Sequence, residues 1–85
     1  MRSTAKVTYT DGHTDTAPLT PRVATSVEEH AQVNGWAAGE ASNIRRAYYI
    51  AYLAQRYAGN TSLPYEQWLD TVDDIEMETP ENPTN

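Results

Sequence analysis

The densest run of apolar residues lies in the middle of the chain, where SNIRRAYYIAYLAQRYA spans residues 42–58. Alanine, leucine, arginine and glutamine favour helices, and residues 47–54 include no charged side chain. Ser42 is suited to cap the start of a helix, and Gly59 followed by Asn60 is suited to end one. A helix that is apolar all round is normally buried on more than one side. We therefore expect residues 42–58 to form the central helix of a small bundle.

A β-hairpin is expected at residues 5–17, with the sequence AKVTYTDGHTDTA. Threonine and tyrosine favour strands, and the pair Asp11-Gly12 is typical of a two-residue hairpin turn. Such a turn would place Val7 opposite Thr16. An isolated two-stranded hairpin is only marginally stable in water, so we expect this one to pack against the helices. The alternative is a disordered polar arm.

Two patterns compete for the start of the first helix. Threonine followed by proline at 20–21 is a good helix start, whereas Ser26 opens a capping box. The helix should end near Val33, because an Asn-Gly pair follows it. Trp36 comes next in the sequence and is expected to plug one end of the bundle.

A third helix is expected over about residues 63–76. Apolar side chains recur there at helical spacing, and carboxylates fill the opposite face; the apolar positions are Tyr65, Trp68, Leu69, Val72 and Ile75. Residues 77–85, METPENPTN, have the composition of a disordered tail. The predicted fold is α+β and mainly α. An N-terminal hairpin precedes a three-helix bundle at 20–76, in a single domain of residues 1–76.

Composition narrows the classes of function. The chain has 85 residues and no cysteine, which excludes disulfides and thiolate metal sites. Its net charge of −6 argues against binding the phosphate backbone of nucleic acids. The uncharged run at 47–54 is far shorter than the roughly 20 residues that span a bilayer, and no signal peptide is visible. We expect a cytosolic protein with no cofactor. Its small core leaves room for stabilisation by a partner or by self-association.

Catalytic chemistry has little support in the sequence. His13 and His30 have no serine or cysteine companion at a recognised spacing, and neither HExxH nor GxSxG occurs. Surface histidines are the simpler interpretation. The carboxylates at 70–78 are better explained as a solvated face than as a cation site. An enzyme is the least expected class.

One line of side chains on the central helix is the candidate partner-binding site. Arg45, Tyr49, Tyr52 and Arg56 share this line, and Tyr65 on the next helix is added to it. Arginine and aromatic residues are enriched at protein–protein hot spots. The alternative is that the tyrosines pack under the hairpin or the first helix, with their hydroxyls reaching water. Stacking of single-stranded nucleic acid is a distant third.

Four segments together resemble the short tail assembly chaperones of long-tailed bacteriophages of actinobacteria: TPR at 20–22, SVEEHA at 26–31, AYYIAYLAQRYAG at 47–59 and LPYEQWLDTVDDIEME at 63–78. The resemblance implies a non-enzymatic protein of the host cytoplasm. Such chaperones bind the tape-measure protein and keep it soluble while the tail tube assembles, and often have a longer companion made by ribosomal frameshifting. The alternatives are a structural head–tail connector or minor tail protein, and an acidic mimic of nucleic acid.

Overall fold

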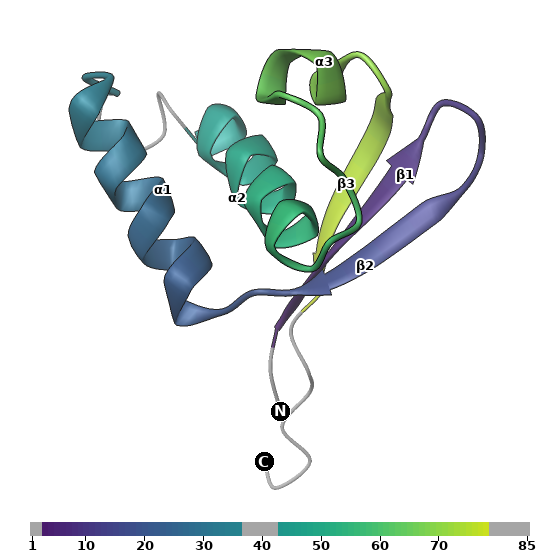
Figure 1. Ribbon diagram of the computed structural model, residues 1–85, viewed down its shortest axis with the longest axis horizontal. Helices are drawn as coiled ribbons and strands as arrows, with labels where there is room; N and C mark the ends of the chain where they lie inside the picture. Colours follow the sequence, from purple (N-terminus) through teal and green to yellow (C-terminus); the bar gives the residue numbers. More distant parts are fainter. Residues whose placement is uncertain (1–2, 37–42, 79–85) are drawn as a thin grey trace, which may run out of the picture.

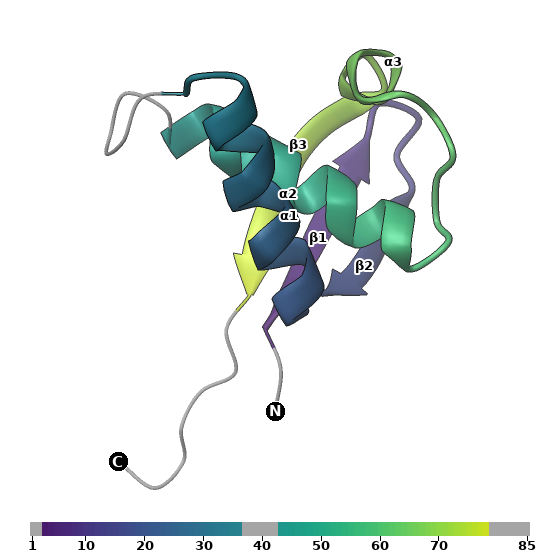
Figure 2. The same cartoon turned by 60° about the vertical axis from the view of Figure 1, so that its left-hand side comes forward.

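The computed structural model describes residues 3–36 and 43–78, which form a three-stranded antiparallel sheet with helices on one face (Figure 1). The order of elements is β1 (Thr4–Tyr9), β2 (Thr14–Pro18), α1 (Pro21–Val33), α2 (Asn43–Tyr57), α3 (Tyr65–Leu69) and β3 (Val72–Glu78). Helix α2 lies between the sheet and α1, as both views show (Figure 2). No helix in this described part of the chain is long and apolar enough to cross a bilayer.

The segment after α3 is a strand, so the expected three-helix bundle is wrong. Helix α3 has five residues, and β3 then pairs with β1 to give the strand order β2-β1-β3. Val7 of β1 is paired with Ile75, and Thr8 with Asp74. In a helix, the carboxylates of this segment would crowd its C-terminus, where the helix dipole disfavours negative charge. In the strand they lie along an edge, which also discourages pairing with other chains.

A β-bulge explains why this strand looks helical in the sequence. The register shifts between Thr8, which pairs with Asp74, and Tyr9, which pairs with Val72. The extra residue allows Val72 and Ile75 to pack on the same core, although they are three residues apart. A spacing of three is also the helical spacing. The strand continues to Glu78, past residue 76, where the sequence predicted the domain to end. Residues 79–85 lie outside the described residues.

The N-terminal hairpin is confirmed, but its register differs from the expected one. Val7 pairs with Asp15 rather than with Thr16. The Tyr9 N–H donates to the His13 carbonyl at 2.9 Å, and the only positive φ in the turn is that of Gly12, at 95°. This is a three-residue loop closed by a left-handed glycine, instead of a two-residue turn. The shift by one residue turns alanine rather than threonine of β2 toward the helices.

The helix ends follow their local sequence. The Thr20 side chain accepts a hydrogen bond from the Val23 N–H at 3.3 Å, with proline at the first helical position, so α1 begins there and not at Ser26. Helix α2 is terminated by Gly59, at φ 83°, as expected. Ser42, the expected cap of α2, lies outside the described residues.

The core lies between the sheet and α2, and one polar residue crosses it. The apolar side chains buried in this core are those of Ala5, Val7, Tyr9, Ala17, Val23, Val27, Ala51, Tyr52, Leu53, Ala54 and Trp68. Gln55 is also fully buried. Its amide nitrogen donates to the carbonyls of Ala5 at 3.1 Å and Asp15 at 3.3 Å. Since those carbonyls belong to β1 and β2, Gln55 fastens α2 to both strands of the hairpin.

Candidate functional site

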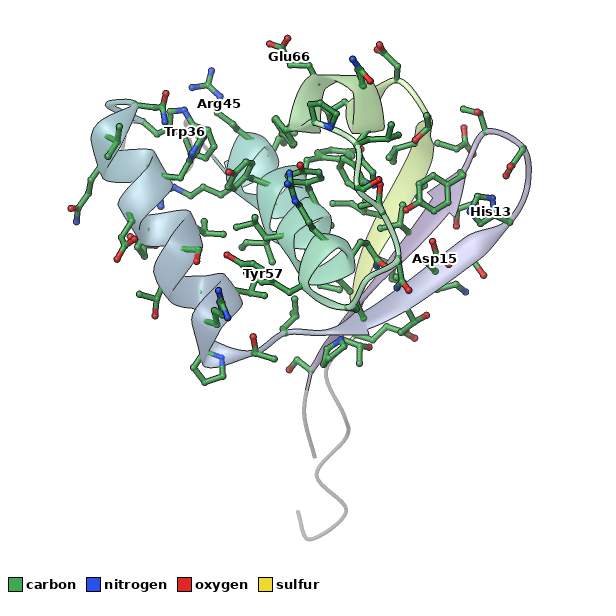
Figure 3. All side chains as sticks on the ribbon, viewed as in Figure 1. His13, Asp15, Trp36, Arg45, Tyr57 and Glu66 are labelled. Atoms are coloured by element: carbon green, nitrogen blue, oxygen red, sulfur yellow. The ribbon has the colours of Figure 1, made fainter. Side chains whose placement is uncertain are left out.

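An open groove of about 610 Å³ lies where the end of α1, the start of α2 and α3 meet. We call it the aromatic groove; its lining residues are His30, Asn34, Trp36, Ile44, Arg45, Tyr48, Tyr65 and Leu69. Figure 3 shows Trp36 and Arg45 together at this end of the helix pair, away from His13 and Asp15 at the hairpin. The groove is therefore built by the helices and not by the sheet.

The end of α1 positions one wall of the groove. Gly35 adopts a positive φ of 66°, and the Trp36 N–H turns back to the Ala31 carbonyl at 2.9 Å. This arrangement satisfies the last carbonyls of the helix and ends it sharply. It brings Trp36 against the ring of His30, with 4.9 Å between the ring centroids. The expectation that Trp36 plugs a bundle is wrong, because it is half-buried in the groove wall.

Tyr49 lies at the centre of the aromatic contacts behind this wall. It stacks on His30 at 4.1 Å and meets Trp36 edge-on at 5.7 Å and Tyr65 edge-on at 4.9 Å. Burial raises the pKa of the phenols of Tyr49 and Tyr65 above the ordinary value, so both remain neutral donors near pH 7. Aromatic pairs in such geometries add roughly 0.5–1.5 kcal/mol each beyond their buried area. The groove therefore has a stiff aromatic base.

Arg45 supplies a positive charge to the groove. Its guanidinium lies 5.3 Å from the centroid of the Trp36 ring, in a cation–π contact. The side chain is exposed. Stacking of this kind holds the planar guanidinium in place while its N–H edge stays available to an acceptor.

The five residues expected to bind a partner are divided between two environments. Arg45 and Tyr65 line the groove, and Tyr49 packs behind them. Tyr52 is only 3% exposed, and its hydroxyl donates to the Leu63 carbonyl at 2.7 Å. Arg56 donates to that same hydroxyl at 2.6 Å. Tyr49 packs against His30 of the first helix, as the packing alternative expected, and Tyr52 is buried with its hydroxyl on the Leu63 carbonyl instead of in water. Arg45 and Tyr65 are the two expected residues that line the groove.

Several groove residues had no place in the site expected from the sequence. His30 was expected at the surface and Leu69 on the apolar face of the third helix, while Ile44 and Tyr48 were given no individual role. Ile44 is 76% exposed, and Tyr48 lies one helical turn after it. Residues four apart on a helix share a face. A plot of the faces of α2 would have shown this apolar pair beside Arg45.

The histidine at the hairpin turn forms a separate local arrangement. The His13 backbone N–H donates to the Asp11 carboxylate at 2.9 Å, which lowers the pKa of that carboxyl below its usual value. The His13 ring stacks on Tyr9 at 4.3 Å. Within residues 3–36 and 43–78, no cluster of three or more histidine and carboxylate side chains is placed to hold a metal ion. These contacts have a structural explanation, since they rigidify the turn.

Comparisons of this chain with protein-family models, with curated proteins and with solved structures found no match.

Proposed function

We propose that this protein is a tail assembly chaperone of a long-tailed bacteriophage. It binds the tape-measure protein in the host cytoplasm and keeps it soluble while the tail tube assembles. The sequence resemblance over residues 20–78 supports the identity of the partner. The aromatic groove supports the mode of action, because it leaves apolar surface open at one end of a small protein.

The chemistry of the groove favours binding over catalysis. Its lining combines aliphatic, aromatic and cationic side chains, and includes no serine, cysteine or carboxylate among the described residues. The imidazole of His30 is stacked on Tyr49. A general base needs a proton donor or nucleophile within hydrogen-bond reach. Aromatic and arginine side chains around an apolar pocket are instead the composition of a protein–protein hot spot.

The single observation that carries the proposal is the exposure of Ile44 inside this groove. Its side chain is 76% exposed, although it lies beside the half-buried rings of Trp36 and Tyr48. Covering an isoleucine side chain with a partner stabilises a complex by roughly 1.5–3 kcal/mol. A client segment that covers Ile44 and the neighbouring rings would bind reversibly, as a chaperone requires.

The test is co-expression with the tape-measure protein encoded by the same phage, followed by co-purification and measurement of the soluble fraction. The variant Ile44→Ser should lose most of the retained tape-measure protein. Val33→Ser is the matched control, because Val33 is 85% exposed but does not line the groove. Both variants should keep the far-UV circular dichroism of the wild type, since neither side chain is buried.

The outcomes separate the site from the function. Equal retention by Ile44→Ser and wild type would refute the groove as the client site. Failure of the wild type to retain or solubilise the tape-measure protein would refute the chaperone function. Mass spectrometry of purified particles adds an independent check: a chaperone should be absent, and stoichiometric copies would identify a connector or minor tail subunit.

A further inference from the structure

The charge of the aromatic groove is opposite to that of the whole chain. The chain has a net charge of −6. The groove is lined by Arg45 and His30, and none of its described lining residues is acidic. The acidic side chains of Glu66 in α3 and of Asp70 directly after it are also outside the lining. The groove thus combines apolar surface with a local positive charge.

Arg45 differs in its partners from the other two arginines of α2, Arg46 and Arg56. Arg46 forms an ion pair with Glu28 at 3.2 Å, and Arg56 donates to the Tyr52 hydroxyl. Arg45 lies over Trp36, and in residues 3–36 and 43–78 no carboxylate is within ion-pair distance of it. A guanidinium on an aromatic face still presents its fork of N–H donors, which matches a carboxylate.

The walls of the groove favour a helical ligand. They come from α2, α3 and the end of α1, so the groove has no strand edge. An extended peptide gains its affinity from main-chain pairing with such an edge, whereas an amphipathic helix binds through side chains at i, i+3 and i+4. Ile44, Tyr48 and Leu69 provide the apolar contacts that the second mode requires.

We propose that the aromatic groove binds a helical partner segment in which a glutamate or aspartate lies one turn from two apolar side chains. The carboxylate pairs with Arg45 above Trp36, and the apolar side chains cover Ile44, Tyr48 and Leu69. This deepens the proposed function by specifying the client segment, and rests on that function only for the identity of the partner. A basic segment would be attracted by the overall charge but repelled by Arg45, which provides specificity.

The probes are three capped, alanine-rich helical peptides of about 18 residues, free of tryptophan. Each has two leucines at i and i+8, and glutamate, glutamine or lysine between them at i+4, one turn from each leucine. Binding to the full chain is measured at low salt by titration calorimetry and by the change in tryptophan fluorescence, to which Trp36 of the groove contributes. The glutamate peptide should bind about tenfold more tightly than the lysine peptide, with the glutamine peptide between them.

Two arginine variants test the assignment to Arg45. Arg45→Met should reduce the affinity of the glutamate peptide about fivefold, to that of the glutamine peptide. Binding of the glutamine peptide itself should change by less than about twofold. Arg22→Met is the matched control, because Arg22 lies 4.8 Å from the Tyr57 ring in an equivalent cation–π contact away from the groove. It should leave all three affinities unchanged.

Retention of the glutamate preference in Arg45→Met, tightest binding of the lysine peptide, or no saturation by any peptide would each overturn the proposal. The urea midpoints of the variants are compared with that of the wild type, so that a loss of the preference for the glutamate peptide is not caused by unfolding. If these peptides fail while Ile44→Ser still loses the tape-measure protein, the charge selection is wrong and the chaperone function stands. If the peptides discriminate but the tape-measure protein is not retained, the identity of the partner is wrong and the groove chemistry stands.

Discussion

Replacement of Gln55 by glutamate offers a sharp test of the packing of α2 on the sheet. Gln55 is fully buried, and its amide nitrogen donates to the carbonyls of Ala5 and Asp15. Its carbonyl oxygen accepts from the Asn60 amide at 2.7 Å. Every polar atom of the side chain is therefore used. Glutamate has the same shape but cannot donate when it is ionised.

The expected magnitude follows from these contacts. Gln55→Met removes all three hydrogen bonds without adding a charge, and each lost hydrogen bond costs about 1 kcal/mol. A buried and unpaired charge costs more, about 3–5 kcal/mol. A core in a domain this small supplies about 3–5 kcal/mol of net stability. Gln55→Glu should therefore be largely unfolded at pH 7, while Gln55→Met stays folded.

The penalty of Gln55→Glu should depend on pH. Burial against two carbonyl oxygens raises the pKa of the new carboxyl in the folded state above the unfolded value of about 4.3. The penalty is therefore complete above the raised pKa and declines as pH falls toward the unfolded pKa. At low pH the protonated side chain again donates one hydrogen bond. The gap between Gln55→Glu and Gln55→Met should narrow between about pH 7 and 5, by at most about 1.4 kcal/mol for each pH unit.

The assay is urea unfolding followed by far-UV circular dichroism and by the fluorescence of the buried Trp68. Trimethylamine N-oxide can be added to populate the folded state of an unstable variant. Comparison of the glutamate and methionine variants removes the titration of the other carboxylates. A glutamate variant within about 0.5 kcal/mol of wild type at pH 7, or an identical gap at both pH values, would refute the reasoning.

Three further substitutions probe the rest of the fold. Trp68→Phe removes the hydrogen bond from the indole N–H to the Tyr9 hydroxyl at 3.2 Å and part of a fully buried ring. Urea unfolding should show a loss of about 2 kcal/mol. Gly59→Ala places an L side chain at a φ of 83°, with no atom within 4 Å of the new Cβ. The backbone strain alone should therefore lower the free energy of unfolding by about 1–2 kcal/mol, and by less in Gly59→Asn. Asp11→Asn removes a carboxyl whose pKa is lowered by the His13 backbone N–H. Wild type should be the more stable at about pH 5, and acid unfolding curves should show that the difference vanishes as pH falls through the lowered pKa.

Local chemistry accounts for what the sequence predicted correctly. The start of α1 and the end of α2 depend on Thr20, Pro21 and Gly59, whose caps involve only residues a few positions away. The existence of the hairpin follows in the same way from Asp11 and Gly12. Its register does not, because the choice between two loop lengths is decided by which face of β2 packs against α2.

Non-local pairing accounts for what the sequence did not predict. The bulge between Thr8 and Tyr9 gives β3 a spacing of three between its apolar residues, which imitates a helix. The spacing alone does not distinguish a helix from a strand here. The strand is favoured because the buried β1 needs a second neighbour, and the residues that pair with it lie more than 60 positions away in the chain. The sequence predicted only part of the candidate site, again because residues distant in the chain decide which side chains are covered. Arg45 and Tyr52 lie on one helical line, but Trp68 and the backbone of Leu63 cover only Tyr52.

The aromatic groove stays open because the chain after α3 enters the sheet as β3. Helix α3 contributes Tyr65 and Leu69 to one wall and ends there. The Thr71 carbonyl then accepts from the Thr10 N–H at 2.8 Å, and the remaining residues follow β1. Residues 72–78 are thus committed to the sheet edge and cannot cover the start of α2.

This open surface is different from ordinary exposure of single apolar residues. Scattered apolar side chains on a surface need no explanation, and Val33 is such a case. Ile44 instead shares a groove with the half-buried Trp36, Tyr48 and Leu69. A ligand that binds the folded state alone raises its stability by mass action. The true client should therefore raise the urea midpoint of the wild type, by an amount that grows with the logarithm of its concentration above Kd, and should leave that of Ile44→Ser nearly unchanged. A client that stabilised both equally would have to bind elsewhere on the fold.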